Sequence, residues 1–156
     1  MQKITEKNNG IYVLEIYAPV SFYLFIKKFA NIKLKPGYYY YAGSAQKNLR
    51  HRILRHLKKN KIIHWHIDHL TSSGSAEIKN IFVLFGKSKS YECRLAQKIS
   101  KIKNAEFILE GFGNSDCSNC PSHLLYSSKR IPQSHFISLY QSTVRFIPSS
   151  IETSWR

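Results

Sequence analysis

The sequence predicts a mixed α/β (α+β) fold in which helices flank a small central antiparallel β-sheet. The segment GIYVLEIYA at residues 10–18 alternates and is rich in β-branched and aromatic residues, which is typical of a strand. The four tyrosines of YYYYAGSA follow the turn signal Pro36-Gly37 and indicate another strand. Leu49, Ile53 and Leu57 then recur at helical spacing. We therefore expect an antiparallel meander that leads into a helix.

The remaining elements follow in chain order. VSFYLFIKKF at 20–29 predicts an additional strand within the opening meander. Further along, the patterns predict a short helix at 62–70, a strand at 77–86, a helix at 90–100 and a short strand at 105–111. The segment 111–123 is typical of a loop, and strand-like pieces recur near 136–140 and 144–147.

The length of 156 residues indicates one domain, which is enough chain to bury a core without disulfides or a structural metal. We assign residues 1–127 to this domain. Residues 128–156 then form a C-terminal extension, either an appendage or a partly ordered tail.

Charge is the strongest bulk signal. The chain has 24 Lys and Arg against 9 Asp and Glu, for a formal net charge of +15. A polyanion relieves such self-repulsion, and nucleic acid is the commonest one. An anionic membrane surface and a merely lysine-rich solvated surface are the alternatives.

The sequence also predicts a cytoplasmic protein without a membrane partner. Its opening segment MQKITEKNNG is polar, unlike a signal peptide, and no apolar run approaches the ~20 residues that span a bilayer. Three cysteines without a secretion signal favour a reducing compartment over a disulfide framework.

Two short motifs lie at strand ends, Gly10-Ile11-Tyr12 and Tyr41-Ala42-Gly43. On adjacent antiparallel strands, Tyr12 and Tyr41 can reach the same surface. Gly43 lets the backbone turn sharply into the following loop. Each tripeptide alone is weak evidence, because glycine and tyrosine commonly meet at strand ends.

Three further residues have the chemistry of a phosphate site. Arg52 and His56 are four residues apart and share one face of the predicted helix. A guanidinium suits a phosphate oxygen, and an imidazole suits proton transfer near a nucleophilic water. Glu92 is one of nine acidic residues and is placed to hold one hard divalent cation such as Mg²⁺.

These elements, in this order from Gly10 to about Ile99, resemble the GIY-YIG nuclease superfamily. The resemblance implies a three-stranded antiparallel sheet that brings the tyrosines together. Tyr12 then corresponds to the general base or water-orienting phenol, and Tyr41 to the tyrosine of the second motif. Arg52 resembles the phosphate-binding arginine, His56 the nearby proton-transfer group, and Glu92 the ligand of a single Mg²⁺ or Mn²⁺.

The chain departs from the family pattern in two places. The second motif is YAG instead of YIG, and the chain between the motifs is longer, with the predicted strand at 20–29. The stretch from Gly10 to Tyr126 more closely resembles an archaeal and bacterial branch that is sometimes fused to an endonuclease III-like repair glycosylase. The shared landmarks are PGYYYYAGSA, HWHIDHL, YEC and GFGNSDCSNCPSHLLY.

The resemblance implies a metal-dependent endonuclease that hydrolyses phosphodiester bonds in DNA, with RNA as a further substrate class and a DNA-repair protein as a partner. The alternative is a DNA-binding module of the same fold without activity. On the predicted helix and beside it, we expect DNA contacts from Arg50, Arg55, Lys58, Lys59 and His66. The alternative is that these residues form a solvated basic face of the helix without a binding role.

A zinc site is a separate hypothesis. Cys117, Cys120 and His123 have C-x₂-C-x₂-H spacing, which suits Zn²⁺, and a closed site needs a fourth ligand. Cys93 or a histidine of HWHIDHL is a candidate for that position. The alternative is two small buried cysteines and a histidine of the core or the active site.

Overall fold

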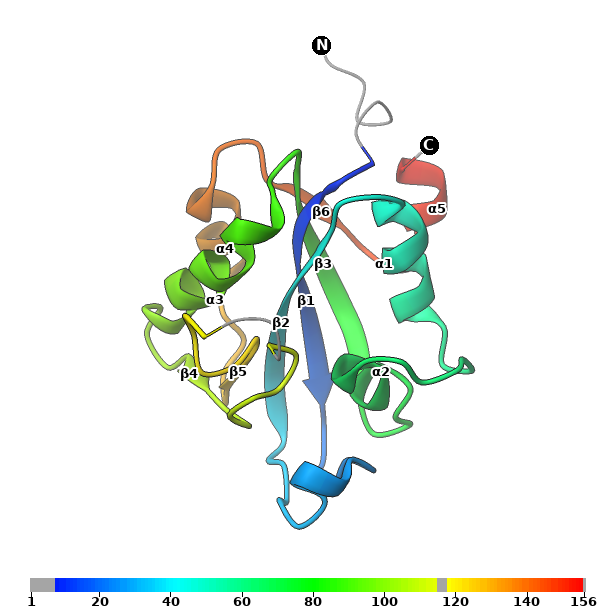
Figure 1. Cartoon of the computed structure of the whole chain (residues 1–156), viewed down its shortest axis with the longest axis vertical. Coiled ribbons are helices and arrows are strands. Elements are labelled where there is room, and N and C mark those ends of the chain that lie inside the picture. The colour runs from blue at the N-terminus through cyan, green and yellow to red at the C-terminus, as the bar shows by residue number, and fades with distance from the viewer. Residues whose placement is uncertain (1–7, 115–117, 156) are drawn as a thin grey trace.

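A computed structural model describes residues 8–114 and 118–155, and their strands form one antiparallel sheet flanked by helices (Figure 1). The strand order is β4-β5-β2-β1-β3-β6. The strands are β1 (Gly10–Ala18), β2 (Gly37–Ala45), β3 (Glu77–Phe85), β4 (Glu106–Phe107), β5 (Leu124–Ser127) and β6 (Val144–Phe146). The predicted fold class is confirmed.

The central strand β1 pairs over its whole length with β2, and it also pairs with β3. Its side chains alternate between two buried faces, since Tyr12, Leu14 and Ile16 belong to one core cluster and Ile11 and Val13 to another. β-Branched and aromatic residues suit such a strand, because both of its faces pack against other side chains.

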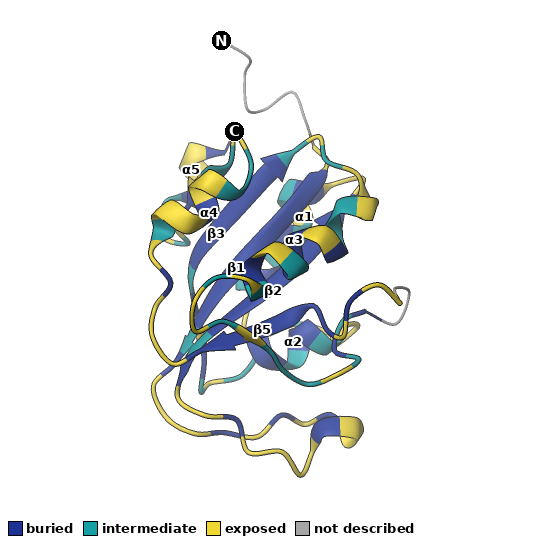
Figure 2. Cartoon of the chain, turned by 90° about the vertical axis from the view of Figure 1, so that its left-hand side faces the viewer, coloured by how far each residue is buried: buried dark blue, intermediate teal, exposed yellow. Residues whose placement is uncertain are grey.

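Helices cover both faces of the sheet. One face carries α1 (Leu49–Leu57), α2 (His66–Thr71) and α5 (Ile151–Ser154), and the other carries α3 (Glu92–Ser100) and α4 (Gln133–Leu139) (Figure 1). Helices α1, α3, α4 and α5 turn exposed residues outward, α2 has only buried and intermediate ones, and the strands beneath are largely buried, as Figure 2 shows. In α1, the buried Leu49 and Ile53 are one turn apart, which is the spacing that the sequence predicted.

Several predicted elements are corrected. Residues 20–29 do not form a strand: they hold one isolated bridge, between Phe22 and Leu34, and the 3-10 turn η2 (Lys27–Phe29). Their exposed side chains, Phe25 above all, have no neighbouring strand to pack against. The predicted helix at 62–70 begins only at His66, and a 3-10 turn, η3 (Lys89–Tyr91), precedes α3. Residues 136–139 are helical, while the strand near 144–147 is confirmed as β6.

The segment after residue 127 packs against the sheet. Arg130 donates to the buried carboxylate of Glu15, from Nη2 at 2.8 Å and from Nε at 3.1 Å. Tyr40 and Asn80 also donate to that carboxylate, so a charge that is costly to bury has several donors. Further along, Phe136 stacks on Phe82 with 4.6 Å between ring centroids. The C-terminal segment therefore completes the core.

Among the described residues, there is no helix of the length and apolar character that crossing a membrane requires.

The packing of α4 gives a stability prediction. Phe136→Ala removes a fully buried ring that stacks on Tyr40 and Phe82, and we expect it to lower the free energy of unfolding by about 3–5 kcal/mol. Ile137→Ala on the same helix is the control, since this side chain is 42% exposed and should change stability by about 0.5 kcal/mol or less. Denaturant unfolding of both variants tests this, and equal losses would contradict the packing.

Candidate active site

One pocket of about 520 Å³ is lined by all five predicted catalytic residues, Tyr12, Tyr41, Arg52, His56 and Glu92. They come from β1, β2, α1 and the first residue of α3. Other lining residues include Ser44, Lys47, Trp65, His66, Asn114 and His123. The fold thus brings together side chains that are spread over eighty positions of the sequence.

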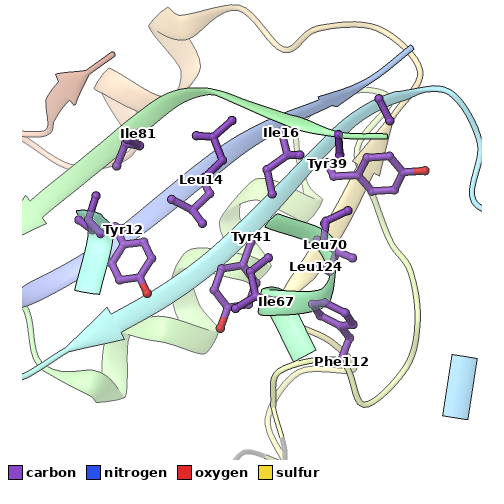
Figure 3. Close-up of a cluster of buried hydrophobic side chains, with 14 of the residues drawn as sticks. Tyr12, Leu14, Ile16, Tyr39, Tyr41, Ile67, Leu70, Ile81, Phe112 and Leu124 are labelled. Atoms are coloured by element: carbon purple, nitrogen blue, oxygen red, sulfur yellow. The ribbon is translucent and has the colours of Figure 1, made fainter. Parts of the chain in front are cut away.

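The position of Tyr12 depends on the pairing of β1 with β2. In this register Tyr12 lies directly opposite Gly43, and the tyrosine ring lies over the glycine. A Cβ atom at Gly43 would be only 2.6 Å from Cζ of Tyr12. Figure 3 shows the rings of Tyr12 and Tyr41 on the same face of the sheet, with their hydroxyl groups toward the same side. The glycine of the YAG motif therefore makes room for the tyrosine of the first motif.

Tyr12 and His56 form a buried pair. The tyrosine hydroxyl lies 2.7 Å from Nε2 of His56, at hydrogen-bonding distance. Burial, followed by the charge of Lys61, lowers the pKa of His56 to about 3, so its ring is neutral at neutral pH. Burial, followed by the neighbouring Tyr41, raises the pKa of Tyr12 well above its ordinary value. The pair therefore holds one transferable proton between two neutral groups.

Arg52 and Glu92 meet at the open edge of β2. Strand β5 pairs only with residues 38–41 of β2, so the carbonyl of Ser44 is left to accept a 2.5 Å hydrogen bond from Nη1 of Arg52. The hydroxyl of the same Ser44 donates to Oε2 of Glu92. Ser44, which lies in the part of β2 that β5 does not cover, thus links the guanidinium of Arg52 to the carboxylate of Glu92.

Glu92 has a second partner in His123. Nδ1 of His123 lies 2.8 Å from Oε1 of Glu92, which is an ion-pair distance. The contact is not aligned as a hydrogen bond, since Nδ1 has no partner of hydrogen-bonding geometry. A ring nitrogen and a carboxylate oxygen this close interact electrostatically whatever the angle of the contact.

The surroundings of Glu92 fit a hydrated divalent cation. Mg²⁺ keeps several water ligands and often binds through a single protein carboxylate, and Glu92 faces a pocket with room for those waters. The contacts of its oxygens with Ser44 and His123 would have to loosen or be shared.

The sequence did not single out Ser44 or Asp68 as parts of the site. The buried Asp68 accepts two hydrogen bonds from Arg55, at 2.9 and 2.8 Å. Burial by itself would raise the pKa of Asp68, but the hydrogen bonds from Arg55 and from backbone N–H groups lower it to about 2. Trp65 lies against both Arg52 and Arg55, with 4.9 and 4.7 Å between ring centroid and Cζ. Asp68 and Trp65 thus hold Arg55 and Arg52 of α1 in place. In the sequence, only the i,i+3 spacing of the two arginines indicated that they share a neighbour.

The predicted DNA-contacting residues mostly make contacts within the protein. Besides Arg55, Arg50 donates from Nε to the carbonyl of Trp155, and Lys59 donates to the carbonyls of Ser73 and Ala76. Nδ1 of His66 accepts a hydrogen bond from the backbone N–H of Gly113 at the pocket wall. Lys58 is exposed. Their binding to DNA stays a prediction.

A larger hollow of about 930 Å³ lies along α1 and the C-terminal segment, and it shares His56 and His64 with the first pocket. It is lined by several basic side chains and by the carboxylates of Glu77 and Glu152. Tyr12, Tyr41 and Glu92 do not line it. The guanidinium, the phenols and the carboxylate come together in the smaller pocket, which makes it the candidate active site among the described residues.

Two of the predicted zinc ligands, Cys120 and His123, lie together with Cys93 beside the smaller pocket. Sγ of Cys93, Sγ of Cys120 and a ring nitrogen of His123 all lie within 4.8 Å of one another. Of the proposed C-x₂-C-x₂-H set, Cys117 lies outside the described residues. Cys93 is one of the completing ligands that the sequence offered, and the other candidates, the histidines of HWHIDHL, do not belong to this group.

The buried His56 predicts how stability depends on pH. Its pKa is 6.5 in the unfolded chain and about 3 in the folded one, so the unfolded state takes up a proton first as the pH falls. The contribution of His56 to the free energy of unfolding should be constant above pH 6.5. At lower pH the free energy of unfolding should decrease by at most about 1.4 kcal/mol per pH unit.

Thermal unfolding of the unaltered protein and of His56→Gln between about pH 7 and about pH 4.5 gives the change in stability per pH unit for each. This pH range lies above the titration of Asp68. We expect a shallower slope than in the unaltered protein. His51→Gln, on the exposed side of the same helix, should keep the original slope. Identical slopes in all three proteins would show that His56 titrates normally in the folded state.

Comparison with known proteins gives one result. A family model described as a domain of unknown function, DUF123, matches residues 11–145, a range that includes all five converging side chains. No curated protein and no solved structure matches the chain. Because the matched range covers most of its length, the chain belongs to the DUF123 family.

Proposed function

We propose that this chain is a divalent-metal-dependent endonuclease that hydrolyses phosphodiester bonds in DNA. The observation that carries the proposal is the convergence of Tyr12, Tyr41, Arg52, His56 and Glu92 on one pocket. The net charge of +15 supports a polyanionic substrate. A role in DNA repair or processing, a repair protein as partner and a cytoplasmic location are parts of the same proposal.

In this proposal Glu92 holds the divalent ion, Mg²⁺ or Mn²⁺, which when bound supplies positive charge to the leaving oxygen and the attacked phosphate. Arg52 contacts the phosphate from the opposite side of the β2 edge. Its guanidinium is positioned beforehand by the carbonyl of Ser44 and the ring of Trp65, so little reorganisation is needed when charge develops.

The Tyr12–His56 pair handles the proton. As water attacks phosphorus, its proton moves to the oxygen of Tyr12, and the phenolic proton moves to Nε2 of His56. His56 is by itself a weak base, because burial lowers its pKa to about 3. The negative charge of a bound phosphodiester favours its protonated form, so the relay operates only once substrate is present.

A second candidate is a DNA-binding module without activity. The observation in its favour is that both oxygens of Glu92 already have partners, in Ser44 and His123. A carboxylate engaged in this way also serves to join α3 to β2 and to the loop before β5.

Replacement of Glu92 distinguishes the two candidates. Glu92→Gln keeps the shape of the side chain but loses the charge that holds a cation, so Mg²⁺- or Mn²⁺-dependent nicking of supercoiled plasmid should fall by about 100-fold or more. DNA retention in a gel-shift assay should stay unchanged. Glu106→Gln, an exposed carboxylate on β4, is the matched control and should nick normally. Absence of nicking in the unaltered protein with either metal would favour the binding module, and undiminished nicking by the Glu92 variant would remove Glu92 from the site.

Gly43 offers a test of the tyrosine geometry. In Gly43→Ala the new methyl group would lie 2.6 Å from Cζ and 2.7 Å from the hydroxyl oxygen of Tyr12, so the ring must leave the position from which its hydroxyl reaches His56. We expect kcat for nicking to fall by about 10-fold or more through loss of positioning, with little change in DNA affinity. Gly74→Ala is the control, because nothing lies within 4 Å of its added Cβ. Equal kcat values for the two variants would contradict the assigned role of Tyr12.

A further inference from the structure

Behind the proposed active site lies a buried group of soft metal ligands, Cys93, Cys120 and His123. We propose that in the reduced protein these three residues bind one zinc ion, at a site distinct from the Mg²⁺ or Mn²⁺ position at Glu92. The proposal does not depend on nuclease activity, because it rests on the donor atoms alone.

The donor atoms are close together and shielded from water. Nε2 of His123 lies 3.3 Å from Sγ of Cys93, which in turn lies 2.7 Å from Sγ of Cys120. The three residues are only 2–7% exposed. Two sulfurs and an imidazole nitrogen favour Zn²⁺ over Mg²⁺, which requires oxygen ligands. Three protein donors leave the fourth tetrahedral position of the zinc ion to a further ligand such as a water molecule.

Two rigid segments hold these donors. Cys93 is the second residue of α3, and the helix fixes it against the sheet. His123 is held as an extension of β5, since its carbonyl accepts from the backbone N–H of Ala42 at 3.0 Å and its own N–H donates to Phe112 at 2.9 Å. The carbonyl of Cys120 accepts a 2.6 Å bond from the side chain of Asn114. The backbone of these ligands is therefore held in place, and the cysteine side chains are what must move to accept an ion.

Binding requires reduction and a small movement. Cys93 is disulfide-bonded in the structure, so a phosphine reductant must first add two electrons and two protons across that bond to free the thiol. The zinc ion then displaces one proton from the thiol of Cys93 and one from the thiol of Cys120. With Zn–S distances of about 2.3 Å and tetrahedral angles, the two sulfurs must separate to about 3.8 Å, which rotation of the cysteine side chains allows.

The second nitrogen of His123 links this site to the active site. Zinc ligands of this kind usually direct their other ring nitrogen at a carboxylate or a carbonyl, which fixes the tautomer and the ring orientation. Here Nδ1 of His123 lies 2.8 Å from Oε1 of Glu92. A zinc ion on Nε2 would keep the proton on Nδ1, facing that carboxylate, so the ion would orient Glu92 through the histidine.

The test is metal binding by the full chain. Protein reduced with a phosphine and freed of metal under anaerobic conditions is titrated with Co²⁺ and then with Zn²⁺. We expect one equivalent of Co²⁺ per chain to produce thiolate-to-cobalt charge-transfer absorption, which Zn²⁺ then abolishes. The protein without reduction should lack this absorption. A reduced protein that binds no Co²⁺, or binds it without a thiolate band, would overturn the proposal.

Variants assign the ligands. Cys120→Ser should lose the charge-transfer band or reduce it by about half, since one of two thiolates is gone, and His123→Gln should weaken Zn²⁺ binding by about 10-fold or more. His123→Cys should restore tight binding with a stronger thiolate band, which shows that a loss in the other variants is not misfolding. His135→Gln, an exposed histidine outside the site, should bind as the unaltered protein does. Unchanged binding in both Cys120→Ser and His123→Gln would place the ion elsewhere. None of these measurements depends on nicking.

Discussion

The pairing of β1 with β2 is the constraint on which the candidate site depends. It sets Tyr12 opposite Gly43, where the missing side chain leaves room for the tyrosine ring. From that position the hydroxyl of Tyr12 reaches His56 on α1. A register shifted by one residue would send Tyr12 to the other face of the sheet, toward α3, and would separate it from α1 altogether. The glycine thus serves the geometry of a side chain on the neighbouring strand.

The shortness of β5 is the second structural condition. Because β5 ends its pairing at Tyr41, the edge of β2 beyond it is left open to groups from both faces of the sheet. Arg52 arrives from α1 and Glu92 from α3, and both contact Ser44. The loop that precedes β5 then returns past this edge and delivers His123 to Glu92. A longer fifth strand would have covered the carbonyl of Ser44 and closed the pocket.

The fully buried carboxylates of the described residues, Glu15 and Asp68, are both paired, and each pair joins elements that are distant in sequence. Glu15 on β1 binds Arg130 beyond β5, and Asp68 on α2 binds Arg55 on α1. Leaving one partner of such a pair unmatched in the interior is costly, so these contacts favour a single arrangement of the elements. Arg55 is consequently held in place as a structural residue, while Arg52, one turn away from His56, faces the pocket.

The sequence by itself determined the strands at 10–18, 37–45 and 77–85 and the helix at 49–57, because alternation and helical spacing are local signals. Motif order also singled out five of the residues that line the pocket, Tyr12, Tyr41, Arg52, His56 and Glu92. Only the tertiary structure decided that residues 20–29 form no strand, that the segment after residue 127 completes the core, and that Ser44 and His123 contact Glu92. The physical reason is that these outcomes depend on which distant surfaces meet, and a local pattern of side chains does not contain that information.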